Sequence, residues 1–383
     1  MITKEESHPF SRGLEDIVAA ESSICMIDGK NSGLYYRGYA IHDLVKNSTF
    51  EETICLLLFG KLPSTGELSD FSGKLARERE IPKELVERMA GFPKGVHPMS
   101  ALRTAVSLLS FFDPEADDKS IESEVRKSIR LIAKTPTIIA AFDRLRKGER
   151  AVPPRLDKEF CSAANFLYML KGKEAAPVEV KMLDKYLILL AEHDLNASTF
   201  AALITASTLS DVYSAVVSAV GTLKGDLHGS ANSRAMESII EVGSVDQVEL
   251  YVDDKIQKKQ KLMGFGHRVY KGPDPRADDL RVMAKTLADS NPEQAKWYAI
   301  SKKLESTVWD RKKLYCNVDF YSASVLYTLG IPIDLFTTIF AISRMAGWTA
   351  HVLEQHRDNR LIRPISNYIG PTNQVYAPIQ NRK

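Results

Sequence analysis

Apolar residues recur at helical spacing along most of the chain, and few stretches alternate between apolar and polar positions. This pattern predicts helices over residues 48–58, 64–80, 83–89, 100–112, 121–147, 176–192, 198–223 and 335–356. Ser64 and Glu67 have the spacing of a capping box, and Asn196 and Ser198 are candidate N-caps after His193, which we expect to open a helix. Two short apolar segments flank turn residues between positions 23 and 38, which predicts a small N-terminal β-hairpin.

The texture of the sequence changes between residues 224 and 318, where glycine, proline and lysine are more frequent and long apolar faces fewer. The apolar helical pattern returns from residue 320 onward. We therefore predict an all-α fold with a smaller helical domain, residues 224–325, inserted into a large helical domain formed by residues 1–223 and 326–383. The length of 383 residues, about twice the ~100–200 of a typical domain, agrees with two domains.

Composition excludes several classes of protein. Lys plus Arg (51) and Asp plus Glu (49) leave a formal charge of +2, which argues against a dedicated nucleic-acid binder. The four cysteines are widely spaced, so a disulfide scaffold or a structural zinc site is not expected. The first residues carry acids and no apolar core, and no apolar stretch approaches the ~20 residues of a membrane helix. We expect a cytoplasmic protein that contacts neither nucleic acid nor membrane.

Three histidines lie in unusual settings. His228 follows Gly225 and precedes Gly229, His267 lies just after a Gly-Phe-Gly run, and His193 lies in a polar interruption between apolar helices. A loop histidine is more often structural than catalytic. Flanking glycines, however, let backbone approach a ligand closely, which favours a functional site near His228 and His267.

Two other charged residues each allow a structural and a functional interpretation. Asp319 precedes an apolar helix, so it is either an N-cap or a carboxylate whose pKa an apolar setting raises toward base function. Arg344 lies on a strongly apolar helix, so it requires either a structural ion pair or a small carboxylate substrate. Arg276 and Arg363 are weaker candidates alone, but together with Arg344 they suit a polyanion.

Cations dominate one stretch of the otherwise balanced chain. Between positions 255 and 276, a single acid, Asp274, stands against seven cations: Lys255, Lys258, Lys259, Lys261, Arg268, Lys271 and Arg276. Such a run is usually a solvated lysine face. The adjoining glycines also fit a phosphate-bearing ligand, although neither a Walker nor a dinucleotide motif is present.

Taken in order, these segments resemble the citrate synthase family. The matching motifs are Arg37-Gly-Tyr, His193-Asp-Leu-Asn-Ala-Ser-Thr, Leu-His228-Gly-Ser-Ala-Asn, Met-Gly-Phe-Gly-His267-Arg-Val-Tyr, Asp274-Pro-Arg276, Asn-Val-Asp319 and Ile362-Arg-Pro. The resemblance spans residues 13–370 and implies a mostly helical homodimer whose small domain closes over the large one. It also implies an acyltransferase that condenses acetyl-CoA with oxaloacetate and hydrolyses citryl-CoA, the entry reaction of the tricarboxylic acid cycle.

The resemblance assigns a role to each matched residue. Asp319 would remove the proton beside the thioester, His228 would hydrogen-bond the thioester carbonyl, and His267 would donate a proton to the ketone oxygen. Oxaloacetate would be held by His193, Arg276, Arg344 and, from the partner subunit, Arg363. The implied CoA contacts are Lys261, Leu262, Met263, Gly264, Phe265, Lys271, Leu227 and Asn317. The resemblance implies no cofactor and no metal, with the CoA thioester as substrate.

Some features depart from the family pattern or leave alternatives open. Asp226 and Ser230 stand where the family often has Pro and Gly, on either side of His228. The segments 97–99, 103–107 and 164–169 are similar to 2-methylcitrate synthases, so propionyl-CoA is an alternative substrate.

Outside this chemistry, we also considered a helical interaction protein with a degenerate site and a metal hydrolase using His193, His228 and Asp319. Neither an HExxH motif nor paired ligand spacings support the latter.

Overall fold

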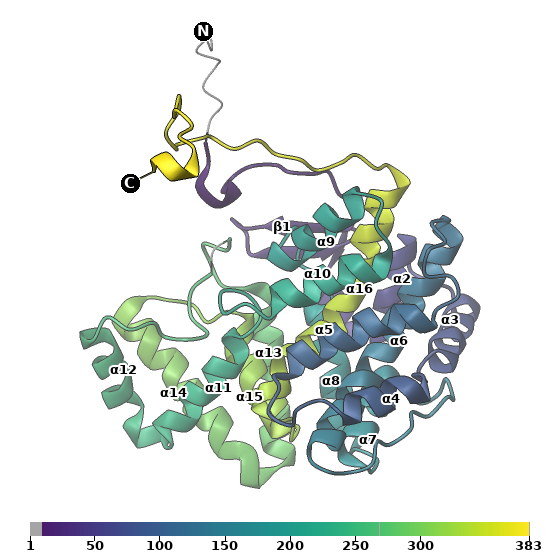
Figure 1. Cartoon of the computed structure of the whole chain (residues 1–383). Helices are drawn as coiled ribbons and strands as arrows, with labels where there is room; N and C mark the ends of the chain where they lie inside the picture. The colour runs from purple at the N-terminus through teal and green to yellow at the C-terminus, as the bar shows by residue number, and fades with distance from the viewer. Residues whose placement is uncertain (1–9, 268, 383) are drawn as a thin grey trace.

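The computed structural model describes residues 10–267 and 269–382 and is built almost entirely of helices (Figure 1). The expected absence of a leader and the cation Arg268 fall on residues outside this part of the chain. The α-helices are α1 (Ile41–Asn47), α2 (Phe50–Phe59), α3 (Thr65–Arg77), α4 (Lys83–Ala90), α5 (Pro98–Leu109), α6 (Ile121–Arg146), α7 (Ser162–Lys171), α8 (Pro177–Leu190), α9 (Ala197–Ser207), α10 (Val212–Leu223), α11 (Ala231–Val242), α12 (Val248–Gln257), α13 (Pro275–Ser290), α14 (Ala295–Lys312), α15 (Val318–Thr328) and α16 (Phe336–Arg357). This architecture confirms the all-α prediction.

The predicted hairpin is present as the first two strands of a small antiparallel sheet. Strands β1 (Cys25–Asp28), β2 (Gly33–Tyr36) and β3 (Tyr39–Ala40) lie in the order β1-β2-β3. Cys25 pairs with Tyr36, and Tyr36 pairs again with Tyr39 on the next strand. The buried Tyr36 anchors this sheet to the helical body, because its hydroxyl lies 3.0–3.2 Å from carbonyl oxygens at the end of α8.

Local capping accounts for several helix boundaries. Ser64 and Glu67 form the predicted capping box at the start of α3, and Asn196 caps α9 by accepting from the Thr199 amide. The prediction of one helix over 198–223 was wrong: α9 ends at Ser207, and Asp211 caps a second helix, α10. The stretch is apolar on both sides of this break and contains no proline there, so its pattern did not reveal the turn.

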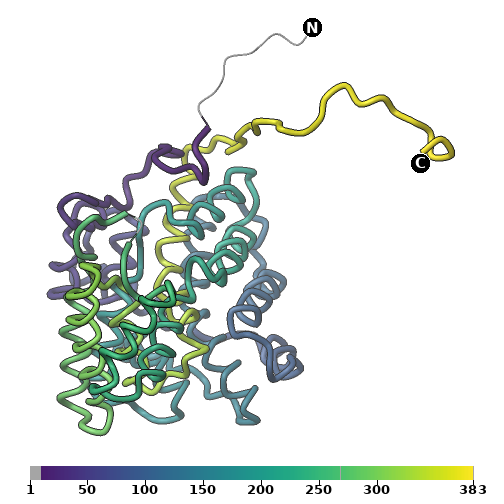
Figure 2. Tube along the Cα trace, turned by 90° about the vertical axis from the view of Figure 1, so that its left-hand side faces the viewer, coloured from purple at the N-terminus to yellow at the C-terminus, as the bar shows by residue number. Residues whose placement is uncertain are grey.

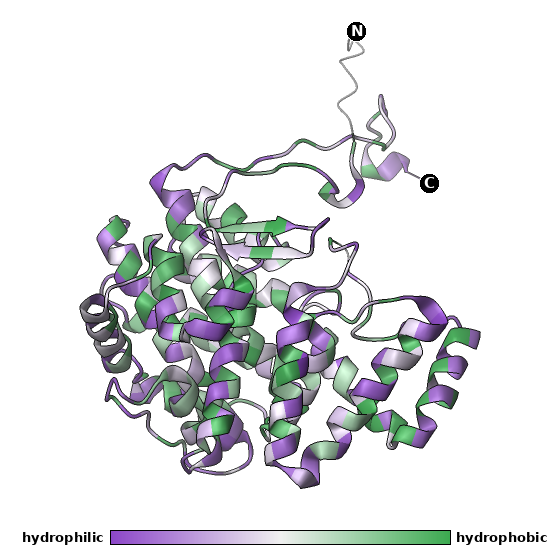
Figure 3. Ribbon diagram, turned by 180° about the vertical axis from the view of Figure 1, so that it is seen from behind, coloured by the Kyte–Doolittle hydropathy of each residue, from purple (hydrophilic) through white to green (hydrophobic). Residues whose placement is uncertain are grey.

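Helix α16 lies at the centre of the fold. Its residues are buried from Phe336 to Leu353, and it packs against α2, α5, α6, α8, α9 and α10. In Figure 3, hydrophobic and hydrophilic segments alternate along the helices, as expected for helices that bury one face and expose the other. A charged residue within this buried stretch of α16 is therefore surrounded by protein, which is the setting of Arg344.

Helices α11 to α14 gather on one side of the molecule (Figure 1), where α12 and α13 both pack on α14. The hydrophobic pattern did not predict these four helices, because their sequences are more polar, and it did not predict α1 or α7 either. Helix α13 also packs on α8 and α15. The proposed division into two domains remains a prediction, and its boundary at residue 326 falls inside the continuous helix α15.

Both described ends of the chain leave the helical body. The segment after α16 extends far from the core, and the first described residues lie near its base (Figure 2). Large apolar side chains are exposed along these arms, including Phe10, Val18, Ile369 and Val375 at 76–92% exposure. In the described residues, no helix is both long enough and apolar enough to cross a bilayer.

Candidate active site

The candidate side chains come from six separate segments and meet beside the N-termini of α13 and α15. His193 and His267 have ring centroids 5.7 Å apart. Both Arg276 and Arg344 lie close enough to His193 to lower its pKa, and Arg276 acts on Asp319 as well. His228 joins this group through Arg344, whose charge lowers its pKa. Six of the seven predicted catalytic and substrate-binding residues are therefore neighbours; the exception, Arg363, is described below.

Asp319 is the second residue of α15 and is not its N-cap. Asn317 caps the helix by accepting from the Asp319 amide at 3.0 Å, so the N-cap reading of Asp319 was wrong. Its carboxylate makes no hydrogen bond in the described part of the protein. Burial raises the pKa of Asp319 from its usual 3.8 to about 7. The positive charge of Arg276 opposes this increase only in part, and the negative charge of Asp274 adds to it. A carboxyl group of this kind can act as a general base near neutral pH.

His228 lies in the turn between α10 and α11, and its neighbours fix the position of its proton. Nε2 accepts from the Ser198 amide at 3.3 Å and lies 2.8 Å from Ser198 Oγ, which accepts from Trp348 and donates to Asn196. Burial, with Arg344 nearby, lowers the pKa of His228 to about 4, so the ring is neutral at pH 7. Since a backbone amide only donates, the ring proton lies on Nδ1, which is left as a hydrogen-bond donor.

His267 has the opposite tautomer. Its Nδ1 accepts from the backbone amides of Val269 and Tyr270 at 3.0 and 3.1 Å. Burial and the nearby Arg276 lower the pKa of His267 to about 4, so this ring is also neutral and carries its proton on Nε2. The two histidines thus present one N–H donor each, held by protein groups behind them.

His193 lies in the loop between α8 and α9, so the expectation that it opens a helix was wrong. Its Nε2 lies 3.2 Å from Tyr270 Oη. Burial lowers the pKa of His193 well below its usual 6.5, and the charges of Arg276 and Arg344 lower it further. The ring is a neutral hydrogen-bonding group between two cations.

Arg276 is buried and held by its own N-cap residue. Asp274 accepts from Nε and Nη2 of Arg276, both at 2.9 Å, and the same carboxylate accepts from the Val318 amide at 3.0 Å. One carboxylate therefore joins the N-terminus of α13 to that of α15 and fixes Arg276 relative to Asp319. Arg276 is only 2% exposed, so this residue, a weaker candidate when taken alone, lies inside the protein beside the other candidates.

Arg344 has no ion-pair partner among the described residues. Nε donates to the Leu190 carbonyl at 2.9 Å and the guanidinium lies over the Phe340 ring, but Nη1 is buried without a hydrogen bond. Burial lowers the pKa of Arg344 in spite of the nearby Glu192. An unpaired buried cation is costly unless an anion joins it, so the geometry favours the substrate reading over the structural ion pair.

The predicted CoA residues divide into two groups. Gly264, Phe265 and Asn317 are built into the protein: Asn317 donates from its amide N–H to the Gly264 carbonyl and from Nδ2 to the Gly266 carbonyl, and Phe265 stacks on Phe320. Gly264 has a φ of +83°, and a Cβ there would lie 2.8 Å from Phe320 Cβ, so only glycine fits. Leu262 and Met263 are partly buried beside them, whereas Lys261, Lys271 and Leu227 are exposed.

Arg363 does not join the other candidates within this chain. It is exposed on the arm that follows α16, outside the group around His193. Asp226 is likewise exposed and pairs with Arg234 at 2.7 Å.

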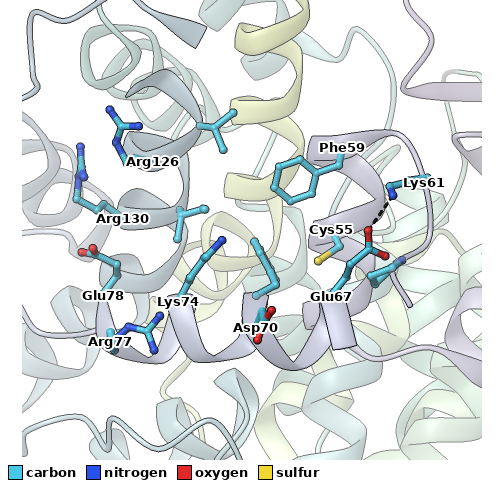
Figure 4. Close-up of a pocket in the computed structure, with 14 residues that line it drawn as sticks. Cys55, Phe59, Lys61, Glu67, Asp70, Lys74, Arg77, Glu78, Arg126 and Arg130 are labelled. Atoms are coloured by element: carbon cyan, nitrogen blue, oxygen red, sulfur yellow. Dashed lines mark hydrogen bonds and ion pairs between the residues drawn. The ribbon is translucent and has the colours of Figure 1, made fainter. Parts of the chain in front are cut away.

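A cavity of about 760 Å³ between α3 and α6 lies apart from the candidate site and shares no residue with it (Figure 4). Its charged rim is largely paired: Lys61 with Glu67, and Arg126 and Arg130 with Glu115.

Among residues 10–267 and 269–382, no group of three or more His, Cys, Asp or Glu side chains is arranged to hold a metal ion.

Several residues that shape the site were not named as functional from the sequence. Ser198 was noted only as a candidate cap, and Tyr270 only as part of a motif, although both position the histidines. Tyr186 and Trp348 carried no signal, because an aromatic residue on an apolar helix reads as core. In the structure, the Trp348 N–H donates to Ser198 Oγ at 3.1 Å, and the Tyr186 hydroxyl is buried without a partner.

Comparisons with known proteins point to one family. A family model described as citrate synthase, C-terminal domain, matches residues 13–365. Citrate synthase 2 of Bacillus subtilis is 50% identical over 373 residues, which cover 97% of this chain and 99% of that protein. A 2-methylcitrate synthase of Shewanella oneidensis is 40% identical over 97% of both chains. A ternary complex of carboxymethyl coenzyme A and oxaloacetate with citrate synthase from Thermoplasma acidophilum has a TM-score of 0.91 at 32% identity, covering 98% of this chain and 100% of that one.

Proposed function

This chain belongs to the citrate synthase family, and from that premise we propose that it condenses acetyl-CoA with oxaloacetate and hydrolyses citryl-CoA to citrate and CoA. The observation that carries the proposal is the trio of Asp319, His228 and His267. It combines a carboxylate with a raised pKa and two neutral imidazoles whose N–H groups are fixed on opposite ring nitrogens. Such a base and two donors are what an enol intermediate requires.

Each group has one task in the condensation. Asp319 takes a proton from the methyl carbon of acetyl-CoA while Nδ1–H of His228 hydrogen-bonds the thioester oxygen. The nucleophilic carbon then attacks the ketone carbon of oxaloacetate, and Nε2–H of His267 protonates the ketone oxygen. The proton that Asp319 gained replaces the one that His267 gave, so both groups are restored before hydrolysis.

Oxaloacetate is a dianion, and the unpaired Nη1 of Arg344 supports a role for this residue as a carboxylate ligand. Arg276 and His193 would complete the contacts from the same chain. The exposed arms support a homodimer, because apolar side chains such as Ile369 and Val375 would be buried against a second copy. In that dimer, Arg363 of the partner subunit would reach the site. The exposed Lys261 and Lys271 would face the phosphates of CoA.

We further propose that residues 224–325 move as a smaller domain over the bound substrates and that catalysis requires no cofactor. A cytoplasmic location is supported by the four cysteines, all free thiols in the structure.

The test is release of CoA thiol in the presence of oxaloacetate, with acetyl-CoA and propionyl-CoA in parallel. We expect a higher kcat/KM for acetyl-CoA. A preference for propionyl-CoA would instead assign 2-methylcitrate synthesis, the alternative favoured by the Shewanella relative. No thiol release with either substrate from folded protein would refute both and leave the interaction protein.

A further inference from the structure

Tyr186 has a buried hydroxyl with no evident partner. The residue lies on α8, its side chain is fully buried, and its hydroxyl makes no hydrogen bond to any described residue. Two other buried tyrosines differ: the hydroxyl of Tyr36 meets carbonyl oxygens and that of Tyr213 meets Asp113. An unsatisfied buried hydroxyl is unfavourable, so a group of this kind usually has a ligand or water as its partner.

The surroundings of Tyr186 are those of the candidate site. Asp319 on α15, Arg276 on α13 and Arg344 on α16 are the charged groups that act on it, and the Asn232 side chain on α11 lies beside it. Burial and the Asp319 carboxylate raise the pKa of Tyr186, so its hydroxyl keeps its proton near pH 7. Asn232 is 1% exposed, and its Oδ1 accepts from the Ser233 amide at 2.8 Å.

A buried hydroxyl without a partner, beside other polar groups, favours a bound water molecule. The Tyr186 hydroxyl has no partner that meets hydrogen-bond geometry, although the Asn232 side chain lies beside it and the charge of Asp319 acts on it. Buried polar groups that lack a well-formed hydrogen bond are commonly joined by water, which needs two to four polar partners. Tyr186, Asn232 and Asp319 supply three.

We propose that Tyr186 and Asn232 hold the water molecule that hydrolyses the thioester intermediate, with Asp319 as the base that activates it. This inference rests on the proposed function. The water oxygen bonds to the thioester carbon as its proton passes to Asp319, and the C–S bond breaks. The same proton then leaves with the sulfur as the CoA thiol, which restores the carboxylate.

The experiment separates the two half-reactions in Tyr186→Phe, which removes only the hydroxyl. We expect hydrolysis of added citryl-CoA to fall at least about tenfold, the effect of losing one hydrogen bond of about 1.4 kcal/mol. Rapid acid quenching of the reaction with acetyl-CoA and oxaloacetate should then reveal citryl-CoA accumulating on the variant but not on the wild type. A merely structural tyrosine would slow both half-reactions together and leave no intermediate.

Two further variants complete the design. Tyr213→Phe removes another tyrosine hydroxyl, bonded to Asp113 away from the site, and should leave the ratio of the half-reactions unchanged. Asn232→Leu, which has a similar volume, should repeat the accumulation and gives the test a second route if Tyr186→Phe folds poorly. Unchanged citryl-CoA hydrolysis in both site variants would overturn the water site alone. A wild type that neither condenses nor hydrolyses would overturn the proposed function and this inference with it.

Discussion

At the scale of single residues, the site depends on ionisable groups held in unusual states by burial. Asp319 is the group that should set the pH dependence. A base acts only when deprotonated, so with a pKa of about 7 we expect kcat/KM for acetyl-CoA to fall tenfold for each pH unit below about 7. His228 and His267, with pKa values of about 4, should add no second limb between pH 5 and 8. A pH–rate profile measures this, and a plateau down to pH 5 would contradict it.

The burial of Asp319 should also lower the free energy of unfolding whenever its carboxylate is charged. The pKa of Asp319 is 3.8 in an unfolded chain and about 7 when folded, so the folded state loses stability as pH rises from about 4 to 7. Asp319→Asn removes the charge, and we expect it to raise the free energy of unfolding at pH 8 by on the order of 2–4 kcal/mol while abolishing turnover. At pH 4 the gain should vanish. Denaturant unfolding at both pH values measures it, with the exposed Asp117→Asn as a control that should show no such gain.

The sequence was sufficient to identify the residues that stand out by their immediate neighbours along the chain. His228 and His267 stood out through their glycines, and Arg344 through its charge on an apolar helix. Tautomers could not be predicted, because they depend on amides of Ser198 and Val269 that only the fold brings to the rings. Tyr186 was invisible for a similar reason: its missing partner is a property of the packed structure.

At the scale of elements, the contact between α8 and α16 holds much of the site. Carbonyl groups at the C-terminus of a helix lack helical partners, and here side chains from other elements satisfy several of them. Tyr36 lies against the carbonyls of Ile188 and Leu189, and Arg344 donates to that of Leu190. This arrangement fixes the loop that carries His193. Sequence periodicity predicted the bounds of α8 and α16 to within two residues. It could not predict how the two helices contact each other, because that contact depends on hydrogen bonds to the carbonyl groups at the end of α8.

Gly347 tests that contact. A Cβ at this position would lie 2.0 Å from Glu192 Oε2 and 2.4 Å from the Ala191 carbonyl, so α16 and the end of α8 would have to separate. We expect Gly347→Ala to lower the free energy of unfolding by about 1–3 kcal/mol and to reduce activity, since Arg344 lies one turn away. In α10, the nearest atom to a Cβ at Gly221 is Arg103 Cδ at 3.7 Å, so Gly221→Ala should stabilise by about 0.5–1 kcal/mol. Equal effects of the two changes in denaturant unfolding would refute this packing argument.

At the scale of the whole molecule, one predicted substrate-binding residue is missing from the group that the fold assembles. The resemblance assigned Arg363 to the partner subunit, and in this chain it is exposed on an arm that leaves the body (Figure 2). Periodicity could not anticipate this arm, because the described residues 358–382 form no α-helix and most of their large apolar side chains are exposed. A site completed by a second copy would account for both features.

Mixed dimers decide whether Arg363 acts across the interface. Asp319→Asn and Arg363→Ala homodimers should each be nearly inactive. Co-refolding them in equal amounts gives mixed dimers in half of the population, and each contains one site with Asp319 from one chain and Arg363 from the other. If Arg363 acts in trans, activity should recover to about one quarter of wild type, because one site in two is intact in half of the dimers. If it acts within its own chain, every site retains one defect and no activity returns. Mixing the homodimers without unfolding is the control, and it should stay inactive until subunits exchange.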